Sequence, residues 1–199
     1  MIEEYNIHIP EEDIDLLKNK IQLTRWPDEI NNKWSHGTDM SFLRELSKYW
    51  CNGFDWRVHE NKINEIGSFK YTSESGLKLH FLYSKSKQDN AIPLVMTHGW
   101  PGSIQEFIKI IPIIQKNSNI PLDIICPSLP GFGFSDKPKK EGMNSKEIAK
   151  LQHELITALG YKKYIVQGGD WGATVSKWMA ELYEDSCIGI HLNMVIAWP

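Results

Sequence analysis

The chain has 199 residues, of which 41% are hydrophobic, and a formal net charge of −3 at pH 7. This length and composition suit one globular domain with a sizeable core, and the small negative charge gives no electrostatic basis for binding nucleic acid or an anionic membrane. Three widely spaced cysteines, Cys51, Cys126 and Cys187, predict reduced thiols and no metal site. Since the sequence shows neither a secretion signal nor a membrane span, we expect a cytoplasmic location.

Residues 1 to about 66 are expected to be helical and irregular. Ile14, Leu17 and Ile21 recur at helical spacing, and Asp39 and Asp55 are placed to cap two further helices. These helices are short and carry bulky apolar stripes. We therefore expect them to pack against a larger body.

From residue 69 onwards the hydrophobic period becomes that of strands. The expected strands are 69–72, 79–83, 93–97, 122–126, 164–166 and 187–192, and the first two form an antiparallel hairpin. Ser103 with Glu106 and Asn144 with Glu147 are capping pairs that begin two of the intervening helices. This alternation predicts an α/β fold with a mostly parallel sheet and a leading antiparallel hairpin, preceded by a helical extension.

The turn after the strand at 164–166 carries the clearest chemical signal. Gly168 and Gly172 flank Asp170 at positions −2 and +2, the spacing of a nucleophile elbow in which Ser usually occupies the centre. A carboxylate that attacks a saturated carbon leaves an ester, which water can hydrolyse, whereas a Ser would leave an ether. An Asp at the elbow therefore favours alkylation chemistry. The alternative is that Asp170 serves only as the N-cap of the following helix.

Two further loops follow strand ends and are expected to meet this turn. They are residues 98–101, with the sequence His-Gly-Trp-Pro, and residues 127–138, which are rich in turn formers. Ligands of α/β sheets bind beyond the carboxyl ends of the strands, where all three segments would lie. A helix cap alone does not predict that convergence.

The chain resembles the α/β-hydrolase superfamily and, within it, the microsomal-type and juvenile-hormone-type epoxide hydrolases. The matching motifs occur in the family's order and span nearly the whole sequence: Thr24–Pro27, Phe54–Arg57, His98–Ser103 with Glu106 and Phe107, Pro127–Ser135, Gly168–Gly172 and His191–Asn193. The resemblance implies that residues 1–90 form the epoxide-hydrolase amino-terminal extension, helical to 66 and then a hairpin that joins the sheet. Residues 91–199 would be the amino-terminal half of the α/β-hydrolase core, truncated after about the sixth strand, without cap or carboxyl-terminal half.

The same resemblance assigns roles to individual residues. Asp170 would be the nucleophile, and the backbone N–H groups of Trp100 and Trp171 would form the oxyanion hole. Trp100, Pro101 and Trp171 would line the substrate pocket. The remaining motif residues would shape the loops without taking part in the chemistry: His98, Gly99, Gly131, Gly133 and Ser135. The implied substrates are a small epoxide and water, with no cofactor.

Family members also carry an acid, a His base and cap tyrosines, which lie after the nucleophile in the chain. The candidates that follow Asp170 are not at the expected places: Glu181, Glu184, Asp185 and His191. We therefore expect the amino-terminal half of an enzyme, which either pairs with a complementing carboxyl-terminal half or self-associates through an open sheet edge. A haloalkane dehalogenase-like hydrolase and a non-catalytic remnant that serves as a binding module remain as alternatives.

Overall fold

The computed structural model describes residues 1–30 and 33–195. The chain divides into two compact units. One is Ile7–Asn61, called here the helical unit, and the other comprises Met1–Asn6 and the chain from Lys62 onwards, called here the sheet unit.

The helical unit contains α1 (Glu11–Gln22), a short 3₁₀ helix η1 (Trp34–His36), α2 (Met40–Asn52) and the start of α3 (Trp56–Ile66). Both predicted caps are confirmed. The Asp39 carboxylate accepts the Phe42 N–H at 2.9 Å, and Asp55 accepts the Arg57 N–H at 2.9 Å. Each satisfies an amide that the first helical turn would otherwise leave unpaired.

A buried carboxylate lies at the centre of the helical unit. Glu60 accepts hydrogen bonds from the Ile9 amide (2.7 Å), the Trp56 indole (2.9 Å) and the Arg57 guanidinium (2.7 Å). Burial raises the pKa of Glu60, but these donors favour its charged form and leave the pKa lowered overall. Arg57 also pairs with Glu11 at 2.8 Å, so the network joins α1 to α3.

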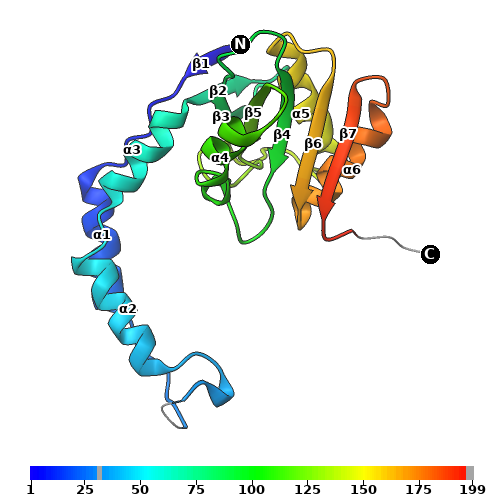
Figure 1. Cartoon of the computed structure of the whole chain (residues 1–199). Coiled ribbons are helices and arrows are strands. Elements are labelled where there is room, and N and C mark those ends of the chain that lie inside the picture. Colours follow the sequence, from blue (N-terminus) through cyan, green and yellow to red (C-terminus); the bar gives the residue numbers. More distant parts are fainter. Residues whose placement is uncertain (31–32, 196–199) are drawn as a thin grey trace. The chain divides into compact units, whose positions relative to one another are not determined.

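The sheet unit is built on seven strands in the order β1-β2-β3-β5-β4-β6-β7. The strands are β1 (Ile2–Glu4), β2 (Ser68–Thr72), β3 (Lys78–Ser84), β4 (Ile92–Thr97), β5 (Leu122–Pro127), β6 (Tyr164–Gly169) and β7 (Cys187–Asn193). Strands β5, β4, β6 and β7 run parallel, as Figure 1 shows, and β1, β2 and β3 add antiparallel pairings. The sheet is therefore mixed, with its parallel part next to the elbow.

Strand β1 corrects the expectation that residues 1–66 contain only helices and irregular segments. It pairs antiparallel with β2, with Ile2 opposite Tyr71. The strand is only three residues long, so its sequence shows too little alternation to reveal it. Its partner lies more than sixty residues away in the chain, and the pairing is therefore a long-range contact that local sequence does not encode.

The helix expected to begin at Ser103 is also corrected. The capping box between Ser103 and Glu106 is present, but it caps a 3₁₀ helix, η2 (Ile104–Glu106), and α4 (Ile110–Asn117) begins later. Pro112 explains the break, because proline has no N–H to donate to the carbonyl of Ile108 and is tolerated only in a first turn. Starting α4 at Ile110 places this proline where its missing N–H is harmless.

Two helices cover one face of the sheet, α5 (Ser145–Ala158) and α6 (Trp171–Leu182), and α4 covers the other (Figure 1). Asn144 caps α5 as predicted, since its side chain accepts the amides of Lys146 and Glu147. Among the described residues β7 has only β6 as a pairing partner, and its Ile188 and Ile190 side chains are exposed. Within the described chain β7 is therefore an edge strand.

Candidate active site

Strand β6 passes directly into α6 at Asp170, whose backbone has φ 53° and ψ −128°. Positive φ is unfavourable for a residue with a side chain, so this position is strained. Both flanking glycines are required by contacts. A Cβ on Gly172 would lie 2.0 Å from the Thr97 carbonyl oxygen, and a Cβ on Gly168 would lie 2.1 Å from the Gly172 carbonyl oxygen. The glycine spacing thus has the steric cause that the sequence predicted.

The Asp170 carboxylate does not cap α6. Within the described chain it accepts no hydrogen bond from the helix amides. Instead its Oδ1 accepts the backbone N–H of Trp100 at 2.6 Å, a short distance typical of a hydrogen bond to a charged acceptor. Asp170 thus occupies the N-cap position that the alternative gave it, but its side chain does not make the capping bond. The strained corner presents the carboxylate to the loop that follows β4.

Gly99 allows that approach. A Cβ at this position would lie 2.2 Å from Asp170 Oδ1, so any other residue would push the carboxylate away from the loop. The sequence predicted only a loop-shaping part for Gly99. The structure adds that its missing side chain makes room for the carboxylate itself.

His98 is buried and links two of the loops. Its Nε2 accepts the Leu129 N–H at 3.1 Å, which leaves Nδ1 to carry the proton and donate to the Gly99 carbonyl at 3.0 Å. Burial lowers the pKa of His98, so the neutral ring is favoured. These contacts fix the 98–101 loop against the loop after β5.

The two predicted tryptophans border the carboxylate. Trp100 and Trp171 are 66% and 56% exposed, and Asp170 between them is half-buried. Of the two predicted oxyanion donors, only the Trp100 N–H bonds the carboxylate among the described residues. Pro101 is exposed beside Trp100, at the outer end of the loop.

The loop after β5 takes its shape from the predicted residues. Gly131 and Gly133 both have positive φ, at 83° and 50°. The Ser135 hydroxyl accepts the His80 N–H at 2.9 Å and donates to the Ser128 carbonyl at 2.8 Å. This loop is therefore tied to β3 from inside the sheet unit.

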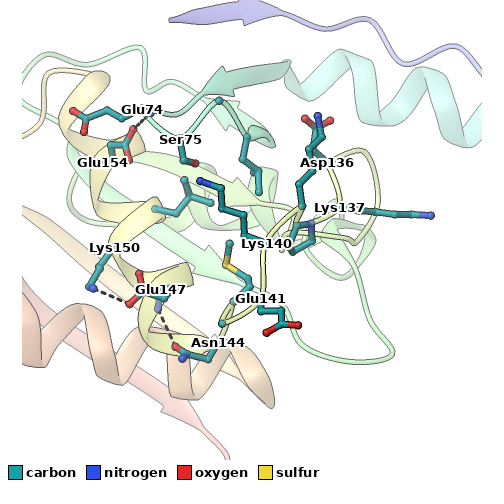
Figure 2. Close-up of a pocket in the computed structure, with 17 residues that line it drawn as sticks. Glu74, Ser75, Asp136, Lys137, Lys140, Glu141, Asn144, Glu147, Lys150 and Glu154 are labelled. Atoms are coloured by element: carbon teal, nitrogen blue, oxygen red, sulfur yellow. Dashed lines mark hydrogen bonds and ion pairs between the residues drawn. The ribbon is translucent and has the colours of Figure 1, made fainter.

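A hollow of about 1080 Å³ lies elsewhere in the sheet unit, between the β2–β3 turn, residues 136–144 and α5 (Figure 2). Asp170 is not among its lining residues. Its walls carry both signs of charge, and Figure 2 shows Lys140 pointing into the hollow while Lys150 pairs with Glu147 at 2.7 Å. The mixed charge indicates a solvated surface.

His191, the one histidine after Asp170, lies on β7 in register with Gln167 and is exposed. Among the described residues no group of three or more His, Cys, Asp or Glu side chains could hold a metal ion. Over the same part of the chain, every helix is too short or too polar to cross a bilayer.

Comparisons with known proteins show the family to which the chain belongs. A family described as "Epoxide hydrolase N terminus" matches residues 2–107, and one described as "alpha/beta hydrolase fold" matches residues 92–199. The chain is 35% identical to epoxide hydrolase 1 of Sus scrofa, over 98% of this chain and 45% of that protein. It is 38% identical to juvenile hormone epoxide hydrolase 1 of Ctenocephalides felis, over 92% of this chain and 40% of that protein.

A solved structure shows the same family resemblance. The crystal structure of juvenile hormone epoxide hydrolase from the silkworm Bombyx mori superposes with a TM-score of 0.89 and 35% identity, over 98% of this chain and 53% of that one. The chain thus spans about half the length of the relatives it matches.

Proposed function

Because this chain belongs to the α/β-hydrolase fold family and carries the epoxide hydrolase N terminus, we propose that Asp170 opens an epoxide ring. The observation that carries the proposal is the position of the carboxylate. It is held on a strained corner, is not hydrogen-bonded to any helix amide of the described chain, and has one oxygen bonded to the Trp100 N–H. The names of the relatives give the substrate class, since they are epoxide hydrolases.

The single hydrogen bond distinguishes the two carboxylate oxygens. Oδ1 is held by Trp100, whereas no described residue bonds Oδ2, so Oδ2 is the oxygen free to attack. Its electron pair forms a bond to a ring carbon, the ring C–O bond breaks, and the ring oxygen takes up a proton from water. The product is an ester of Asp170 in which Oδ1 is the carbonyl oxygen.

The second step would hydrolyse that ester. When water adds to the ester carbonyl carbon, negative charge develops on Oδ1, which the Trp100 N–H already faces. Removing one such donor raises a barrier by about 3 to 4 kcal/mol in other hydrolases. Collapse of the adduct would release a vicinal diol and restore the carboxylate. We propose that Trp171 N–H is the second donor, engaged once the ester forms.

Water needs a base, and the resemblance places the acid and the His after Asp170. We propose that these groups lie in the part of the relatives' length that this chain does not match, and that a complementing carboxyl-terminal segment would supply them. For the 199-residue chain itself we expect ester formation without efficient hydrolysis. The alkylated enzyme should therefore accumulate.

Mass spectrometry tests the proposal. The chain is incubated with styrene oxide, and the adduct is located by peptide mapping. We expect one persistent adduct on the peptide that contains Asp170 and none in Asp170→Asn. The exposed Asp185→Asn is the matched control and should be modified like the unaltered chain.

Three outcomes would contradict the proposal. Rapid diol formation without an adduct would exclude the stalled ester. Faster modification by a chloroalkane than by styrene oxide would favour the dehalogenase-like reading. No modification by either reagent would favour a non-catalytic role.

A further inference from the structure

Three buried polar side chains from three elements lie beneath the elbow. Thr97 ends β4, Gln152 is on α5 and Ser176 is on α6, and their exposed fractions are 1%, 0% and 0%. The Thr97 hydroxyl donates to Gln152 Oε1 at 2.9 Å. Strand β4, which leads into the 98–101 loop, is thereby hydrogen-bonded to α5.

This cluster keeps polar atoms unpaired. Gln152 Nε2 and Ser176 Oγ have no hydrogen-bond partner among the described residues. An unpaired buried donor or acceptor costs roughly 1 to 3 kcal/mol. Apolar side chains would avoid this penalty, so stability alone does not account for a carboxamide at position 152. Unpaired groups and backbone strain that gather at one place point to a functional constraint.

The cluster adjoins the backbone that presents the nucleophile. Thr97 pairs with Gly168 in the β4–β6 register, and a Cβ on Gly168 would lie 2.7 Å from Ser176 Oγ. The Thr97 carbonyl lies against Gly172 on the other side of the elbow. Thr97 is also the last residue of β4, three positions before Trp100. Any rotation of the strand end would be transmitted directly to the Trp100 N–H.

We propose that Gln152 and Thr97 are positioning residues for the nucleophile. Their hydrogen bond fixes the end of β4, and this keeps the Trp100 N–H directed at Asp170 Oδ1. The inference rests on the proposed function, because it assigns a task to residues that do not touch the substrate. Gln152 acts through Thr97, and Thr97 acts through the loop backbone.

Isosteric substitutions separate positioning from stability. Thr97→Val removes the hydroxyl, Gln152→Met removes the carboxamide, and each single change leaves the partner unpaired. In the double variant both partners are apolar and similar in shape, so stability should return to at least the starting value. A misplaced catalytic group slows a reaction even in a stable protein. We therefore expect the double variant to melt like the unaltered chain and to be alkylated at Asp170 about tenfold more slowly.

Two further variants serve as controls. Ser145→Ala removes a different hydrogen bond between α5 and α6, the 2.8 Å contact with Thr174, and should leave the alkylation rate unchanged. Thr97→Ser keeps the hydroxyl and loses only a methyl group. It should be less stable than the unaltered chain yet retain most of the alkylation rate. An equal loss of rate in Thr97→Ser and Thr97→Val would overturn the inference, even if the double variant does not fold.

Hydrogen exchange of the Trp100 amide gives a second readout that needs no epoxide. We expect a protected amide in the unaltered chain and in Ser145→Ala, and about tenfold faster exchange in the double variant. If no chain is alkylated but the exchange rates follow this order, the positioning role stands and the proposed function fails. If the double variant matches the unaltered chain in both alkylation and exchange, the positioning role fails.

Discussion

His80 and Gln152 are both completely buried in the sheet unit, yet their surroundings differ. The His80 ring has a partner at each nitrogen, Ser68 Oγ at 2.9 Å from Nε2 and Ser128 Oγ at 2.8 Å from Nδ1. Gln152 has a partner at its oxygen only, and the nearby backbone of Asp170 is strained. A fully paired cluster can be explained by folding alone. A cluster that keeps unpaired atoms next to the backbone on either side of Asp170 is explained better by the chemistry at the Asp170 carboxylate.

The largest effect is expected for a substitution that adds a side chain at the closely packed elbow. In Gly172→Ala the new Cβ would lie 2.0 Å from the Thr97 carbonyl oxygen, a backbone atom that cannot move aside without shifting β4. We expect a loss of about 3 kcal/mol or more in the free energy of unfolding, measured with urea. Gly189→Ala on β7 is the matched control, since its Cβ would meet Ile165 at an ordinary 3.6 Å. Equal tolerance of both changes would show that the elbow is not constrained by close packing.

The next effect concerns the stability of the cluster formed by His80, Ser68 and Ser128 at acid pH. Burial, and to a lesser degree the charge of Lys70, lowers the pKa of His80 from 6.5 to about 3. Between these two values the folded state binds fewer protons than the unfolded state. The His80 contribution to stability is therefore complete above pH 6.5 and is lost as the pH falls towards 3.

We expect this histidine to account for about 2 kcal/mol of the stability lost between pH 7 and pH 5. His80→Gln keeps a hydrogen-bonding side chain but does not titrate, so its unfolding free energy should fall less over that range. Urea titrations of both proteins at the two pH values measure the difference. If both proteins lost the same unfolding free energy between pH 7 and pH 5, His80 would be protonated in the folded state without a loss of stability.

An effect of similar size is expected when one hydrogen-bond partner of His80 is removed. Ser128→Ala would leave His80 Nδ1 buried without its hydroxyl partner. We expect a loss of roughly 1 to 3 kcal/mol in the free energy of unfolding, with the alkylation of Asp170 unchanged. A stability change near zero would indicate that the His80 ring finds another partner.

Local signals in the sequence predicted much of this structure, and non-local contacts explain what they missed. The caps at Asp39 and Asn144 act within a few residues, and the glycines on either side of Asp170 stand at a fixed spacing around it, so both patterns are readable. The bond between Thr97 and Gln152 joins residues fifty-five positions apart, and no spacing rule encodes it. A signal was nonetheless present, because Gln152 is an uncharged polar residue among the buried apolar positions Leu151, Leu155 and Ile156.

The smallest effect is expected for Ser176→Ala, and it should differ clearly from the effect of Ser128→Ala. Ser176→Ala removes a buried hydroxyl that has no partner among the described residues, so it removes a penalty and no hydrogen bond. Alanine also favours the helix slightly more than serine does. We expect no loss of stability, and a gain of up to about 1 kcal/mol, in the same urea titration. A loss comparable with that of Ser128→Ala would show that the Ser176 hydroxyl is paired in solution, and the distinction between the two clusters would then rest on Gln152 Nε2 alone.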